Sequence, residues 1–180
     1  MDCMMRTMGQ LFILFAMLLE TGAHAADRLD NLLIQGENFI ISVKEPMGWK
    51  GDSSTSADRG NLVFHRINEN LQNAKAVILV LVANKTDENT IEDLKFDMES
   101  YRKQYPKVQF KDISVKHPAY SIYPKLFYVD ANFYEYVAYL NPGKNYPYLI
   151  CVSMNLKKNE ASKEDIEAYS SVIESLKALK

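Results

Sequence analysis

The chain has 180 residues, of which 47% are hydrophobic and 24% are charged, a composition typical of a folded globular protein. Its 21 basic and 23 acidic residues nearly cancel, leaving a formal net charge of −2 at pH 7. Such a balance gives no electrostatic attraction for a polyanion. We therefore expect no nucleic acid among its partners.

The first 25 residues have the pattern of a cleaved signal peptide. Arg6 precedes the apolar run Leu11–Leu19, and Ala23-His24-Ala25 places small residues at the positions that a signal peptidase reads. The run is too short to span a bilayer, which takes about 20 residues. We expect export, to the periplasm if the source is a Gram-negative bacterium and otherwise by secretion. Translation starts at one of three methionines, Met1, Met4 or Met5.

Cleavage leaves residues 26–180, a length that favours a single domain without a transmembrane segment. It also removes Cys3, so Cys151 is left without a partner for an intramolecular disulfide. Cys151 lies within the apolar run Tyr148–Leu156. This position is typical of a buried and inert cysteine.

The N-terminal part of this domain is expected to be rich in strands. Asp27–Leu33 is consistent with a short helical turn, and Phe39–Val43 predicts the first strand. A corner at Pro46–Trp49 leads into a polar stretch, Lys50–Gly60, that predicts a loop. Leu62–Ile67 then predicts a second strand.

The next two segments are the strongest strand and helix signals. Ala76–Ala83 is apolar at every position, which favours a central strand covered on both faces. Thr90 can cap a following helix, and Pro106 ends it. The apolar residues of that helix recur at spacings of three and four: Ile91, Leu94, Met98, Tyr101 and Tyr105.

The C-terminal part predicts a strand, a meander and a final helix. Val108–Val115 changes its apolar phase between Phe110 and Ile113, which suggests a bulge. The meander comprises three segments, Leu126–Val129, Phe133–Leu140 and Tyr148–Leu156. A helix is predicted for Ser162–Ala178, with an apolar stripe that includes Ile166, Tyr169, Val172, Ile173, Leu176 and Leu179.

Successive hairpins and two amphipathic helices define the expected fold class. The strands favour a largely antiparallel sheet, and a central strand buried on both faces calls for helices packed against it. We therefore expect an α+β protein, an α/β/α sandwich with a C-terminal helix.

The segment Phe39–Trp49, with the sequence FIISVKEPMGW, resembles the opening strand and Pro-x-Gly-Trp turn of PsbP-like and DcrB-like proteins. These share a fold with the Mog-type Ran-binding factor, and the order of elements over residues 36–179 is similar. The resemblance implies an α/β/α sandwich and an exported, non-catalytic accessory role, which in PsbP is to assist photosystem II. Members of this fold bind unrelated partners, so the resemblance implies no particular ligand and no site residues.

Aromatic residues are the best candidates for a binding surface. Tyr120, Tyr123 and Tyr146 lie beside prolines and outside the regular alternation of the meander, which favours exposure. Trp49 follows the Gly48 corner and can either plug the core or stack on a ligand. We therefore take Trp49, Tyr120, Tyr123 and Tyr146 as candidate residues for binding a partner or ligand.

Catalytic patterns are sparse. A hydrolase would have to use Ser121 or Cys151 as its nucleophile with His117 as the base, and no Gly-x-Ser-x-Gly sequence supports this. Residues 26–180 contain only three Cys and His residues, His65, His117 and Cys151, too few for a structural zinc site. We therefore expect no metal and no cofactor.

The function favoured by the sequence is that of an exported accessory or binding protein of the cell envelope, without enzymatic activity, associated with an envelope protein or another exported component. Two alternatives remain open. One is a carrier that holds a small ligand between sheet and helix, and the other is the hydrolase that uses Ser121 or Cys151 with His117.

Overall fold

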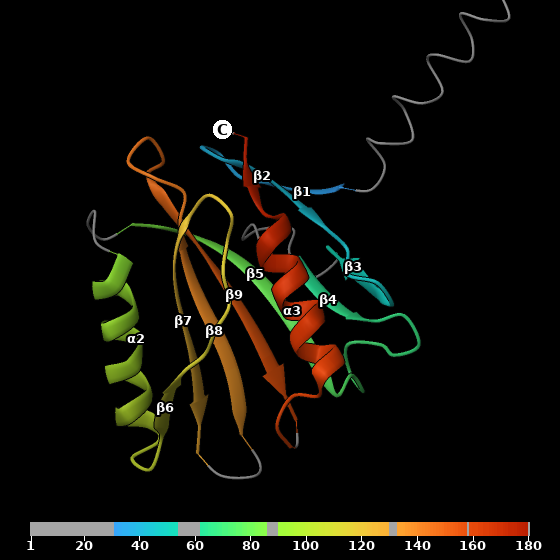
Figure 1. Ribbon diagram of the computed structural model, residues 1–180, viewed down its shortest axis with the longest axis vertical. Helices are drawn as coiled ribbons and strands as arrows, with labels where there is room; N and C mark the ends of the chain where they lie inside the picture. The colour runs from blue at the N-terminus through green and yellow to red at the C-terminus, as the bar shows by residue number, and fades with distance from the viewer. Residues whose placement is uncertain (1–30, 54–61, 86–89, 130–132, 158, 180) are drawn as a thin grey trace, which may run out of the picture.

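The computed structural model describes residues 31–53, 62–85, 90–129, 133–157 and 159–179. They form two antiparallel sheets and two helices (Figure 1). The expected signal peptide, its cleavage site and residues 54–60 of the expected polar loop lie outside the described residues. Within the described part of the chain, neither helix has the length and apolar character needed to cross a membrane.

The large sheet has seven strands. Their spatial order is β3 (Trp49–Asp52), β4 (Leu62–Arg66), β5 (Ala76–Asn84), β9 (Tyr148–Leu156), β8 (Tyr134–Asn141), β7 (Ser121–Tyr128) and β6 (Gln109–Asp112). Each neighbouring pair is antiparallel, and β7, β8 and β9 form the predicted meander. The predicted central position of β5 is confirmed, because it pairs with β4 on one side and β9 on the other.

The small sheet joins the two ends of the described chain. Its central strand is β2 (Ile40–Lys44), which pairs with β1 (Asn31–Gln35) on one side and with β10 (Lys177–Ala178) on the other. The expected helical turn at Asp27–Leu33 is therefore wrong for its described part, because Asn31–Leu33 is extended and paired.

The larger hydrophobic core lies between the large sheet and α3 (Lys163–Ser175). Alternate residues of β5 and β9, such as Ile78 and Val152, face this core, and Tyr169 and Ile173 of α3 fill it. The helix begins at a capping box in which Asp165 N–H donates to Ser162 Oγ over 3.2 Å. The cap and the apolar stripe therefore direct the same face of α3 to the sheet.

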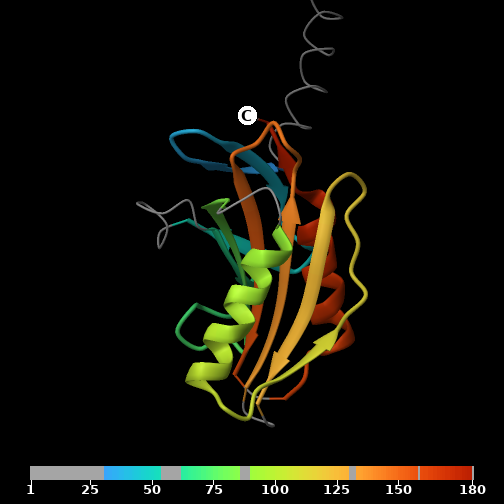
Figure 2. The same ribbon diagram turned by 90° about the vertical axis from the view of Figure 1, so that its left-hand side faces the viewer.

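A second, smaller core lies between the sheet and α2 (Thr90–Gln104), which begins at the predicted Thr90. Leu94 of α2 packs there with the alternate residues of the strands, whose side chains point away from the larger core. These include Val137 of β8 and Leu149 of β9. Figure 2 shows α2 and α3 on different sides of the large sheet.

The predicted end of the last helix is wrong. The helix ends at Ser175, and Leu176 takes an extended conformation with φ −62° and ψ 132°. Lys177–Ala178 then pairs with β2, and Leu179 N–H donates to Ile40 O over 2.7 Å. The apolar spacing of Leu176 and Leu179 suits a helix, but the open side of β2 offers backbone hydrogen bonds that the helix cannot supply.

Two further corrections concern loops and strands. The predicted loop Lys50–Gly60 begins in a strand, because β3 continues to Asp52. The phase change in Val108–Val115 marks the end of a strand and not a bulge. Phe110 of β6 packs in the smaller core, whereas Ile113 packs against the larger core, because the chain leaves the sheet edge and crosses to the other side.

Candidate functional site

The four aromatic candidates do not form one exposed patch. Trp49 is buried in the larger core, with 4% of its surface exposed. Tyr120 and Tyr146 pack against the same core, whereas Tyr123 packs against the smaller one on the other side of the sheet. The binding of a partner or ligand by these residues stays a prediction, although not through one common exposed surface.

Tyr120 and Tyr146 each have a structural role. The Tyr120 ring stacks on His117 with centroids 4.1 Å apart, and its hydroxyl accepts a hydrogen bond from Ala178 N–H over 2.7 Å. The Tyr146 ring packs against Tyr148 with centroids 5.5 Å apart. These contacts stabilise β10 and the β8–β9 loop, so the rings are largely used within the fold.

The residues of the hydrolase alternative are not brought together. The His117 ring is held on both sides: Nδ1 accepts from the amides of Ala119 and Tyr120, and Nε2 lies 3.0 Å from Leu176 O. Cys151 instead packs against the smaller core, where burial raises the pKa of its thiol to about 12. The described residues contain no hydrogen bond from His117 to Ser121 or Cys151, and this arrangement activates neither nucleophile.

The most unusual surface feature is the turn between β2 and β3. Met47 lies at its tip with 99% of its surface exposed, and Ile67, at the end of β4, is 56% exposed. The turn is closed by a hydrogen bond from Trp49 N–H to Pro46 O, and Ile67 N–H donates to Gly48 O, both over 3.0 Å. Because Gly48 has a φ of +77°, it accommodates a turn that other residues adopt only with strain.

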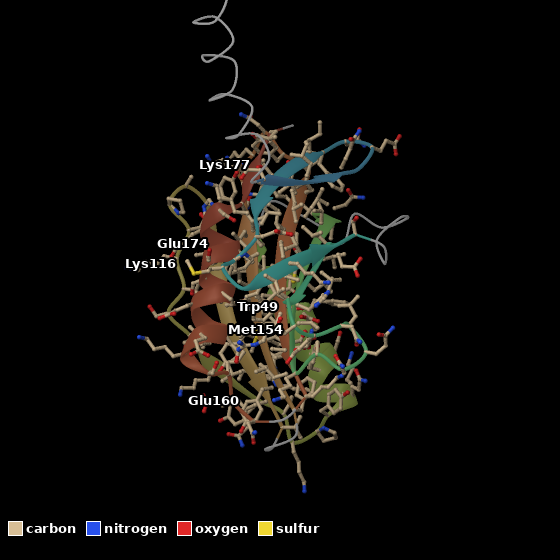
Figure 3. The ribbon with its side chains drawn as sticks, turned by 90° about the vertical axis from the view of Figure 1, so that its right-hand side faces the viewer. Trp49, Lys116, Met154, Glu160, Glu174 and Lys177 are labelled. Carbon is tan, nitrogen blue, oxygen red and sulfur yellow. The ribbon has the colours of Figure 1, made fainter. Side chains whose placement is uncertain are left out.

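This turn borders a pocket of about 420 Å³. Its lining combines the turn with one side of α3 and includes Gly48, Trp49, Arg66, Ala168 and Ser171. Figure 3 shows Trp49 where β3 passes α3. The pocket is therefore built on ordered elements, with an apolar side chain presented at its edge.

The charges around the pocket are ordered. The Arg66 guanidinium lies 5.5 Å from the centroid of the Trp49 ring and donates to Asp165 Oδ1 over 2.7 Å. Glu164 and Glu167 of α3 supply carboxylates to the lining. The carboxylate of Asp165 engages the arginine, and that of Glu167 forms an exposed ion pair with Lys163 over 3.5 Å, whereas Glu164 favours a partner that combines apolar and cationic groups. Met47, Ile67, Trp49, Glu164 and Glu167 are called the Met47 site below.

A second pocket, of about 520 Å³, lies at the C-terminal end of β5. Ser121 and Tyr146 line it together with Lys85. Lys85 Nζ donates to the carbonyl oxygens of Gly143 and Tyr146 over 2.9 and 2.8 Å, and these bonds hold the β8–β9 loop. This pocket therefore brings together Ser121, the nucleophile of the hydrolase alternative, and Tyr146, one of the four aromatic candidates.

Beneath α2 lies a cluster of buried and partly buried polar side chains. Tyr101 of α2 donates its hydroxyl hydrogen to Glu135 of β8, while Tyr139 of β8 donates to Asp97 of α2 over 2.7 Å. Burial raises the pKa of both carboxyl groups, although the tyrosine donors oppose the shift. The two crossed bonds fasten α2 to the sheet. No described group of three or more Cys, His, Asp or Glu side chains is arranged to hold a metal ion.

Sequence reasoning missed Met47 and the cluster beneath α2. The sequence does place Met47 at the second position of the Pro46-Met47-Gly48-Trp49 corner, where a turn exposes its side chain. No comparable signal links Asp97 with Tyr139 or Tyr101 with Glu135, because their proximity depends on how α2 lies on β8.

Neither a scan against models of known protein families nor a search of curated proteins finds a match for this chain.

Proposed function

We propose that the protein is an exported, non-catalytic accessory protein of the cell envelope that binds another protein through the Met47 site. The fold we propose for it is an α/β/α sandwich of the PsbP-like and DcrB-like type. The observation that carries the proposal is the fully exposed Met47 on a turn fixed by two backbone hydrogen bonds. An exposed apolar side chain on an ordered turn is suited to insertion into a partner.

The surroundings of Met47 support a protein partner over a small ligand. Ile67 extends the exposed apolar surface, and Glu164 adds negative charge beside it. A partner segment with apolar side chains flanked by Lys or Arg would complement both features. Methionine adapts to varied apolar surfaces because its side chain is flexible and polarisable.

The two alternatives have weaker support. Between the sheet and α3, side chains with no exposed surface, such as Phe64, Ile78 and Tyr169, fill the space that a carrier would use. The hydrolase requires a base near its nucleophile, and both ring nitrogens of His117 are engaged by the backbone.

The proposal is tested by affinity capture of the tagged full chain from its own cells. We expect a partner to be recovered with the unmodified protein and to be reduced at least tenfold by Met47→Glu. The matched control is Phe96→Glu, because Phe96 is 73% exposed on α2 and lies outside the Met47 site. Capture should also weaken at high salt if the carboxylates contribute.

Recovery of the same proteins by the unmodified chain and by Met47→Glu would exclude the Met47 site as the binding surface. Turnover of simple esters or peptides by the purified chain, lost in Ser121→Ala or Cys151→Ala, would instead establish the hydrolase.

A further inference from the structure

We infer that β1 is a docking edge on which a second copy of this chain adds its own β1, antiparallel and centred on Leu33. This proposal concerns a surface separate from the Met47 site. In the described part of the chain, β1 has a neighbouring strand on one side only, which is β2. Figure 1 shows the β1–β2 hairpin and the C-terminal strand together at one end of the molecule.

The hydrogen-bond pattern identifies the free backbone groups of β1. The hairpin is closed by a bond from Gly36 N–H to Phe39 O over 3.0 Å. Because bonded and non-bonded pairs alternate along an antiparallel ladder, Ile34 and Leu32 exchange the next bonds with β2. The amides and carbonyls of the alternate residues, Asn31, Leu33 and Gln35, therefore point away from β2.

The opposite side of β2 supports this assignment. Ile40 accepts a hydrogen bond from Leu179 N–H over 2.7 Å, so its carbonyl points towards β10 and away from β1. Ile40 is the partner of Gln35 in the β1–β2 register. Gln35 is therefore at a position where β1 and β2 do not exchange backbone bonds, as the alternation requires.

The edges of the large sheet differ from β1. Both carry charges that discourage strand addition, Lys50 and Asp52 in β3 and Lys111 and Asp112 in β6. One edge amide of β3, that of Gly51, already donates to Glu45 Oε1 over 2.7 Å. By contrast, β1 has the sequence Asn-Leu-Leu-Ile-Gln, without charge, proline or glycine. It lacks the features by which edge strands avoid association.

The sequence of β1 is complementary to itself. In an antiparallel pair centred on Leu33, Asn31 lies opposite Gln35 of the second copy, and Leu32 lies opposite Ile34 of the second copy. Amides then meet amides and aliphatic side chains meet aliphatic side chains. The three residues with free backbone groups can exchange bonds in both directions across the two-fold axis, as an isologous contact requires.

The side chain of Leu33 gives this contact an apolar component. Leu33 is 62% exposed in the single chain, and pairing would bring it against Leu33 of the second copy. Leu179 is 58% exposed in the same small sheet but lies beyond β2, away from the free edge. Five residues bury a small area, so the dimer should be weak and depend strongly on concentration.

The test is sedimentation equilibrium of the purified full chain from about 10 μM to about 1 mM, the range in which a weak dimer dissociates. We expect a reversible monomer–dimer equilibrium that Leu33→Pro weakens at least tenfold. Proline removes the outward N–H of Leu33 without removing a bond to β2, a position that edge strands tolerate. Leu33→Lys, which opposes two like charges, should have the same effect, and Leu179→Lys is the matched control.

Hydrogen exchange gives a second measurement on the unmodified chain. The amides of Leu33 and Gln35 should exchange more slowly as concentration rises, whereas the amide of Ile34, already bonded to β2, should change less. Circular dichroism and thermal melting establish whether each variant is folded. If Leu33→Pro fails to fold, Leu33→Lys decides the result.

A chain that stays monomeric at about 1 mM overturns the proposal. So does a dimer that persists in the folded Leu33 variants, or one that is lost in Met47→Glu but kept in Leu33→Lys. The last result would place self-association at the Met47 site. Loss of partner capture with an intact dimer would affect only the proposed function.

Discussion

The two helices, α2 and α3, have similar lengths and lie on different sides of the large sheet, but they are held by different interactions. On the α3 side a large apolar core is combined with a hydrogen bond from the hydroxyl of buried Tyr169 to Val152 O over 3.1 Å and with the Arg66–Asp165 ion pair over 2.7 Å. On the α2 side a smaller apolar cluster is combined with the bonds of Tyr101 to Glu135 and of Tyr139 to Asp97. Attachment of α3 thus depends mainly on packing, with one ion pair at its N-terminal end, whereas attachment of α2 depends on two carboxyl groups whose pKa values are raised by burial.

The largest expected effect is a difference in the free energy of unfolding between matched truncations in the two cores. Ile173→Ala should cost about 4 kcal/mol, because Ile173 has no exposed surface and its neighbours cannot close the cavity. Leu94→Ala should cost about 2 kcal/mol, because partly exposed side chains around the smaller core can relax. Urea unfolding of both variants measures the difference. Equal costs would mean that the two helices are packed equally firmly.

The second prediction uses the Cys151 thiol to report on α2. Its pKa of about 12, against an ordinary 9.0, lowers the thiolate fraction at pH 8 roughly a thousandfold. Alkylation at pH 8 should therefore be slower in the folded chain by about that factor than in urea, as measured on the Cys151 peptide by mass spectrometry. Leu94→Ala should accelerate alkylation more than Ile173→Ala if access requires local opening of α2. Rapid alkylation of the unmodified chain would contradict the raised pKa of the thiol.

The sequence predicts the structure on the α3 side of the sheet better than that on the α2 side. The reason is that the correctly predicted features depend on residues that are close together in the sequence. The apolar run that forms β5 and the start of a helix at Ser162 are set by neighbouring residues, and both are found where expected. The pairing of Lys177–Ala178 with β2 is not local, because only the folded chain brings the free side of β2 to the end of α3. The helical spacing of apolar residues therefore extends beyond Ser175, the residue at which the helix ends.

Contacts between residues that are distant in the sequence also limit what can be predicted about the candidate residues. Tyr120 lies beside a proline and outside the alternation, which favoured exposure, but its hydroxyl meets Ala178, 58 residues later. The bonds of Tyr101 to Glu135 and of Tyr139 to Asp97 join residues 34 and 42 positions apart. Such pairs depend on the position of a helix on a sheet, which one sequence without its fold does not determine.

The third prediction concerns Glu135, where burial raises the pKa above its ordinary 4.5. Because the folded pKa exceeds the unfolded one, the contribution of Glu135 to stability is complete below the ordinary value. It declines as pH rises through the folded pKa. Glu135→Gln should therefore raise the free energy of unfolding at pH 8 by about 1 kcal/mol and have little effect near pH 4. Urea unfolding at both pH values measures this, with Glu164→Gln on exposed α3 surface as the control. A loss of stability at pH 8 would mean that the bond from Tyr101 outweighs the cost of burying the charge.

The smallest expected effect concerns His117, on the α3 side. The dependence of stability on pH has the opposite sign there to that at Glu135. Burial lowers the pKa of His117 below its ordinary 6.5, although the bond to Leu176 O opposes the shift. The contribution of neutral His117 is therefore complete above pH 6.5 and is lost as pH falls through the folded pKa. Between pH 7 and pH 5, the unmodified chain should lose about 0.5 kcal/mol relative to His117→Gln, a small value because solvent screens the ring.

An NMR titration of the His117 ring gives the direct measurement, and a midpoint at or above 6.5 would contradict the prediction. Protonation would place a hydrogen on Nδ1, which already accepts from the amides of Ala119 and Tyr120. The ring would then have to move, and its bond to Leu176 O at the end of α3 would be strained. Acid would thus weaken the link between α3 and β10 while strengthening that between α2 and β8. Opposite pH slopes in His117→Gln and Glu135→Gln would establish that the two sides of one sheet respond to protonation in opposite directions, and additive effects in the double variant would establish that they do so independently.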